Sequence, residues 1–187
     1  MLALAESCQS ALNARESALA WAGGVIVATG FAAVVWRVAT RRRVWPGSRR
    51  LGAATACLLA LATVFAGGTG AAGGSVLADV GHSCPSAFDL NIDLGPAGDA
   101  IFIGLFVLLC LGPLLVGALV GALGLRVSSG DRLALVLGAL VGAATTAITA
   151  LVVHSHKPEG VDLLPAVALV VFGVAAAATC LAGLRHR

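Results

Sequence analysis

Charged residues are scarce in this chain, and some residue types are almost missing. Asp, Glu, Lys and Arg make up only 11% of the 187 residues, there is no Tyr, and there is a single Met. Soluble domains carry about 25% charged residues, so this chain has too little polar surface to cover a globule in water. Its apolar residues form long runs instead, which is typical of integral membrane proteins.

Common catalytic and nucleotide-binding motifs are missing as well. The sequence has no CxxC, HExxH or GxSxG motif, and no Walker-type or GxGxxG loop in a polar segment. Apart from Arg37 near the end of the first apolar run, no Asp, Glu, Lys, Arg or His lies within these runs, whereas ion-coupled transporters usually place such groups within the membrane. The sequence therefore predicts a protein that is neither an enzyme nor a proton-driven pump, and that holds no cofactor.

Five apolar runs are long enough to cross a membrane, which takes about 20 helical residues. They cover approximately residues 18–39, 51–72, 100–125, 133–153 and 163–184. The sequence thus predicts an all-α, polytopic membrane protein with one integral domain, a five-helix transmembrane bundle. We interpret residues 1–17 as a solvated extension of the first span. The excess of Arg over Lys, with many Ala, Gly, Val and Leu residues, indicates a bacterial source and hence the bacterial inner membrane.

The basic residues indicate how the chain is oriented. If the N-terminus is outside and the C-terminus inside, every basic residue except Arg15 and Lys157 lies on the inner side, as the positive-inside rule requires. The inner basic loop, residues 40–50, holds the main topology determinants, which are Arg41, Arg42, Arg43, Arg49 and Arg50. This loop could also bind anionic lipid or a partner. Because the charges are sorted by loop, the net charge of +3 does not indicate nucleic acid binding.

The one long polar segment is an outer loop at residues 75–99, which contains four aspartates, a His and a Cys. A cluster of glycines precedes it and weakens the helix, so we expect the second span to fray between Gly67 and Ser75. Cys84 in this loop and Cys8 near the N-terminus both lie on the outer side, where disulfides persist. We expect a Cys8–Cys84 disulfide, and the alternative is two free thiols.

Three histidines on the predicted outer side could bind a metal. They are His82 in the outer loop, and His154 and His156 in the short loop before the fifth span. Histidine binds zinc or copper, but these spacings match no tight site. The alternative is that they are solvated loop histidines.

Two further features concern the spans themselves. Pro113 lies in the middle of the third span, where it removes a backbone donor and should kink the helix. Gly138 and Gly142 form a GxxxG pair in the fourth span, a pattern that favours close helix packing.

These observations favour a non-catalytic accessory, scaffold or assembly subunit of a membrane complex. Its partners would be the lipid bilayer and either other membrane subunits or further copies of itself. A second hypothesis is a transporter or channel for a small or lipophilic solute, along a path lined by Thr145, Thr146 and Thr149. These hydroxyls could instead bond to their own helix. A third hypothesis is an outward-facing metal or redox site.

Overall fold

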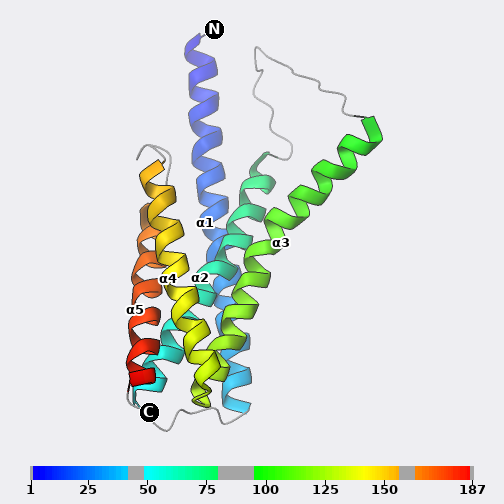
Figure 1. Ribbon diagram of the computed structural model, residues 1–187. Coiled ribbons are helices and arrows are strands. Elements are labelled where there is room, and N and C mark those ends of the chain that lie inside the picture. The colour runs from blue at the N-terminus through cyan, green and yellow to red at the C-terminus, as the bar shows by residue number, and fades with distance from the viewer. Residues whose placement is uncertain (1, 42–48, 80–94, 156–162, 186–187) are drawn as a thin grey trace. The chain divides into compact units, whose positions relative to one another are not determined.

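The computed structural model describes residues 2–41, 49–79, 95–155 and 163–185, and in parts of the helices it describes the backbone alone. Apart from a short turn at residues 129–131, all of these residues are helical. The elements in chain order are α1 (Leu2–Arg41), α2 (Arg49–Asp79), α3 (Gly95–Ser128), α4 (Arg132–Ser155) and α5 (Leu163–Arg185) (Figure 1). The predicted all-α class is therefore confirmed.

Each helix contains a segment that is long and apolar enough to cross a membrane. These segments are Asn13–Arg41, Leu51–Ser75, Leu111–Ser128, Arg132–Ser155 and Leu164–Arg185. The first is part of an unbroken 40-residue helix that begins at Leu2, and the solvation of residues 1–17 stays a prediction. By length and composition, the chain is a candidate multi-pass membrane protein with five spans.

The glycine cluster does not end α2, so the predicted fraying is wrong. The helix continues through Gly67 and Ser75 to Asp79, and α3 already begins at Gly95. Both ends of the predicted outer loop are therefore helical, and residues 80–94 lie outside the described part of the chain.

The packing of α2 against α1 explains why these glycines remain helical. A Cβ atom added at Gly70 would overlap the carbonyl oxygen of Gly23, and one added at Gly74 would overlap that of Leu19. The two backbones touch directly, which is possible only without side chains. This contact offsets a helix-propensity cost of about 1 kcal/mol per glycine.

The chain divides into two compact units, each built from two stretches of sequence. The first unit combines Met1–Ala28 with Ala66–Leu115, and the second combines Thr29–Phe65 with Val116–Arg187. The glycine contacts between α1 and α2 described above belong to the first unit. The second unit contains the C-terminal part of α1, the N-terminal part of α2, the end of α3, and all of α4 and α5.

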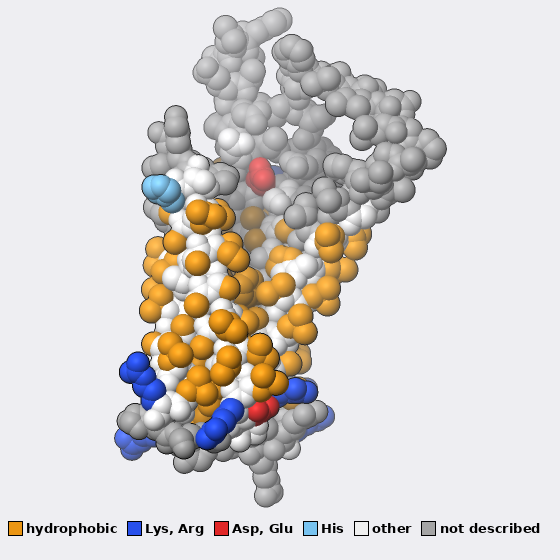
Figure 2. All heavy atoms as spheres, in the orientation of Figure 1, with side chains coloured by type: hydrophobic (Ala, Val, Ile, Leu, Met, Phe, Trp, Pro, Cys, Tyr) orange, Lys and Arg blue, Asp and Glu red, His pale blue; other side chains and the backbone are white. Residues whose placement is uncertain are grey.

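The second unit has a small, dry core with an apolar exterior. Its largest fully buried side chains are Leu58, Leu61, Leu135, Val127 and Cys180. Many large apolar side chains of the same unit are exposed, for example Leu119 at 72% and Leu151 at 69%. Figure 2 shows apolar side chains along the visible length of the helices and basic side chains gathered at one end. An exterior of this kind suits lipid and not water.

A tight turn joins α3 to α4. Gly130 has a φ of 78°, a left-handed conformation that favours glycine after a helix, and its N–H donates to the carbonyl of Val127. Asp131 then caps α4, because its Oδ1 accepts a hydrogen bond from the Leu133 N–H at 3.1 Å. This turn sets α3 and α4 as antiparallel neighbours with only three non-helical residues between them.

Pro113 lies within α3, which continues as helix on both sides of it. In the first unit, a Cβ added at Gly68 on α2 would be 3.4 Å from the Pro113 Cβ. The proline ring therefore packs against a position with no side chain. The predicted kink stays a prediction.

Candidate functional site

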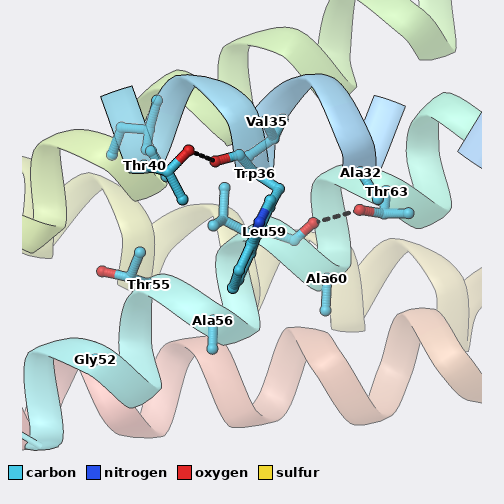
Figure 3. A pocket seen from close by; sticks show the side chains of 12 residues that line it. Ala32, Val35, Trp36, Thr40, Gly52, Thr55, Ala56, Leu59, Ala60 and Thr63 are labelled. Carbon is cyan, nitrogen blue, oxygen red and sulfur yellow. Dashed lines mark hydrogen bonds between the residues drawn. The ribbon is translucent and has the colours of Figure 1, made fainter. Parts of the chain in front are cut away.

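The described residues of the second unit form a groove of about 350 Å³ between α1 and α2. We call it the α1–α2 groove. It is lined by Ala32, Val35, Trp36, Ala39 and Thr40 of α1, by Gly52, Thr55, Ala56, Leu59, Ala60 and Thr63 of α2, and by Leu125 of α3 (Figure 3).

Each helix presents a regular face to the groove. The lining residues of α1, from Ala32 to Thr40, recur at spacings of three and four, as do those of α2 from Gly52 to Thr63. Such spacing places them along one side of a helix. Most are small, and this explains why the two helices leave a hollow instead of a filled contact.

Trp36 is the largest side chain of the groove. Figure 3 shows its indole extending from α1 toward α2, beside Leu59 and Ala56. It is nevertheless 64% exposed. The ring therefore forms one wall of a hollow that is open to the surroundings.

The polar groups of the groove are threonine hydroxyls, and two of them are satisfied locally. Thr40 Oγ1 donates to the Trp36 carbonyl oxygen at 2.9 Å, and Thr63 Oγ1 donates to that of Leu59 at 2.8 Å. Thr55 differs, because the residue is only 8% exposed and its hydroxyl oxygen has no hydrogen-bond partner in the structure. The lining is thus apolar in effect, with one unsatisfied hydroxyl.

One end of the groove is basic. Arg49 begins α2 three residues before the lining residue Gly52, so it lies on the face of α2 that lines the groove. Arg37 and Arg41 each follow a lining residue of α1 by one position, so they lie on faces of α1 turned away from the lining. All three arginine side chains are exposed. Of the predicted topology determinants, Arg41 ends α1, Arg49 begins α2 and Arg50 lies in the first turn of α2. Arg42 and Arg43 lie outside the described residues.

A second feature of this unit is the seam between α4 and α5. A Cβ added at Gly142 would be 2.5 Å from the Gly173 carbonyl oxygen, and one added at Gly173 would be 2.6 Å from Thr146 Oγ1. One added at Gly138 would be 2.9 Å from the sulfur of Cys180. The structure therefore places both glycines of the predicted GxxxG pair in this close contact.

The threonines of α4 are engaged with their own helix. Thr145 Oγ1 donates to the Val141 carbonyl oxygen at 2.8 Å, and Thr146 Oγ1 donates to that of Gly142 at 2.9 Å. Thr145 is also buried. Neither residue is among those that line the α1–α2 groove.

The predicted metal and disulfide residues are described only in part. His154 is exposed near the end of α4, while His82 and His156 lie outside the described residues. Among the described residues, no group of three His, Cys, Asp or Glu side chains is placed to hold a metal ion. Cys84 is likewise outside that part, and the side chain of Cys8 is not described, so their disulfide stays a prediction.

The sequence analysis missed the α1–α2 groove, although a signal was present. Thr55, Leu59 and Thr63 lie at i, i+4 and i+8 on α2, and Ala32, Trp36 and Thr40 repeat that spacing on α1. Each pattern marks one helix face. Neither pattern predicts that this face of α1 lies opposite this face of α2.

Comparison of the chain with family models, with characterised proteins and with solved structures finds no match. The function is therefore argued from the residues and contacts above.

Proposed function

We propose that this chain is a multi-pass protein of a bacterial inner membrane and serves as a non-catalytic accessory or scaffold subunit of a membrane complex. The observation that carries the proposal is the distribution of side-chain size in the second unit. Many large apolar side chains are exposed, whereas the closest contacts between helices are made at glycines. A body of this kind offers apolar surface to the helices of other subunits or of further copies.

The charges of the second unit support an orientation with the C-terminus inside. Its described basic residues lie at one set of helix ends, and they are Arg37, Arg41, Arg49, Arg126, Arg132 and Arg185. His154 lies near the opposite end of α4, which begins at Arg132. The basic end is the one expected in the cytoplasm.

The other two hypotheses receive less support from the contacts. A threonine-lined path would need hydroxyls that face a hollow, but those of Thr145 and Thr146 bond within α4. Of the three histidines predicted as metal ligands, only His154 lies within the described segments. The accessory or scaffold role therefore agrees best with the described residues.

Two fusions test the orientation. A reporter that is active only in the cytoplasm should work when it is fused after Arg187, and an export-dependent reporter should work at Asp89. Each reporter exchanged to the other position serves as the control and should be silent. Activity of the exported reporter after Arg187 would reverse the proposed orientation.

Gentle extraction tests the scaffold role. The tagged chain, extracted in a mild detergent, should travel with another membrane protein or as a defined homo-oligomer, which mass spectrometry of the intact complex would identify. The same preparation in a harsh detergent is the control and should release the single chain. A lone monomer under the mild conditions would contradict the scaffold role without affecting the membrane location.

A further inference from the structure

We infer that the α1–α2 groove binds one acyl chain of an anionic phospholipid, whose headgroup phosphate is held by Arg49. The inference rests on the proposed membrane location, and it adds a ligand class and a site. Three properties of the groove support it, namely its length, its lining and the charge at its end.

The dimensions match a single lipid chain. Along α2 the groove extends from Gly52 to Thr63, which is roughly 16 Å at a rise of 1.5 Å per residue. One leaflet of a bilayer contributes about half of a hydrocarbon core that is about 30 Å thick.

The lining favours a hydrocarbon over a polar solute. Alanine, valine, leucine and the indole of Trp36 make up most of the wall, and the hydroxyls of Thr40 and Thr63 are already bonded to their own helices. No charged side chain is among the lining residues. Among the lining hydroxyls, Thr55 alone lacks a partner, so a polar solute would regain few of the hydrogen bonds to water that it loses here, whereas an acyl chain loses none.

The charge at the groove's end selects the headgroup. Arg49 is exposed at the start of α2, on the helix face that lines the groove. In the second unit, Asp131 is the one acidic residue within the described segments, and its carboxylate caps α4. Guanidinium groups bind phosphate oxygens in pairs, so a headgroup with net negative charge is favoured over a zwitterionic one.

Tryptophan fluorescence can report the occupant directly, because Trp36 forms a wall of the groove. The full chain carrying Trp21→Phe and Trp45→Phe retains Trp36 as its only tryptophan. It is reconstituted into phosphatidylcholine vesicles that contain increasing amounts of phosphatidylglycerol. In one series the phosphatidylglycerol carries brominated acyl chains, and in the other the phosphatidylcholine does, so quenching identifies the lipid that contacts Trp36.

We expect brominated phosphatidylglycerol to quench Trp36 more strongly at equal mole fraction. The preference should be about fivefold in relative binding constant for each arginine that contributes. Arg49→Gln should bring the ratio close to one. The matched control, Arg132→Gln, removes the same charge from a helix that does not line the groove and should keep the preference.

A second control uses the other tryptophan of α1. The protein that retains only Trp21, which is 44% exposed in the first unit, should show no preference between the two lipids. Unchanged helix content by circular dichroism establishes that each variant is folded.

The outcomes separate this inference from the proposed function. Equal quenching of Trp36 by both lipids would overturn the lipid site and leave the membrane location standing. Absence of quenching by either lipid in a chain that floats with the vesicles would mean that protein covers the groove, which also overturns it. A chain that does not float with the vesicles would refute the membrane location itself.

Discussion

Single glycines determine how closely the helices of this protein approach one another. At Gly142, the backbone of α4 touches the backbone of α5 near Gly173, with no room for a further carbon atom. At Gly30 on α1, by contrast, an added Cβ would meet nothing within 4 Å. The same residue type thus has a packing role in one helix and no contact in another.

This difference gives a prediction at the scale of one residue. Gly142→Ala should force α4 and α5 apart and lower the free energy of unfolding by about 1–3 kcal/mol, as overpacking does. Gly30→Ala, its matched control, should be neutral or slightly stabilising, because alanine has the higher helix propensity. Unfolding in mixed detergent micelles, followed by circular dichroism, would measure both, and equal effects would contradict the backbone contact.

The contact between α1 and α2 differs between the two units. In the first unit, Gly70 of α2 lies against Gly23 of α1, whereas an added Cβ at Gly73, three residues further along α2, would meet nothing within 4 Å. In the second unit, other residues of the same two helices are mostly small and leave the α1–α2 groove. One helix pair therefore packs backbone to backbone in one unit and encloses a hollow in the other.

The glycine-rich part of α2 provides a prediction at this scale. Gly70→Leu should push α2 away from α1 and increase amide hydrogen exchange over residues 66–75, because the glycine-rich helix then loses the contact that offsets its low propensity. Gly73→Leu should leave the exchange unchanged or slow it. Comparable exchange in both variants would show that the contact with Gly23 does not hold this part of α2 in place.

The α1–α2 groove provides a second prediction for helix faces. Ala32→Leu combined with Ala56→Leu should fill the groove, since both alanines line it, and should reduce the phospholipid that copurifies with the chain. The matched pair, Ala33→Leu with Ala53→Leu, adds the same bulk at exposed alanines outside the lining and should have no effect. Phosphate analysis after gel filtration would measure the bound lipid, and equal retention in both pairs would argue against a site in the groove.

At the scale of the whole molecule, charge is distributed unevenly along the sequence. Almost all of the arginines lie in the segments predicted to be inside, and most of the acidic residues lie in those predicted to be outside. The membrane orientation should depend on the basic loop at residues 40–50, because basic residues in short loops near the ends of spans set the topology.

Replacing Arg41, Arg42, Arg43, Arg49 and Arg50 with Gln should therefore give a mixed orientation. A cytoplasm-dependent reporter fused after Arg187 should lose part of its activity, and an exported reporter at the same position should gain some. Arg15→Gln with Lys157→Gln removes basic residues from the outer segments and should leave the orientation unchanged. A fully retained inside C-terminus in the first variant would show that other charges determine the topology.

The amino-acid sequence by itself determined that the chain is all-helical and where its apolar helices lie. Hydropathy and length are local properties, so the five spans could be located directly, and Gly130 with Asp131 marks the turn between α3 and α4. The end of α2 was misjudged, because helix propensity counts the cost of Gly70 but not the contact with Gly23 that offsets it. A prediction from one segment cannot include a partner that lies far away in the sequence.

Only the tertiary structure decided which helix faces meet and what they leave between them. The spacing of Ala32, Trp36 and Thr40 marks a face of α1, and Thr55 with Thr63 marks a face of α2. Periodicity alone does not predict which two faces lie against each other. The groove exists because these two small-residue faces are opposed, with arginines at the same end of both helices. This pairing is a property of packing between segments, so it could not be predicted from either pattern alone.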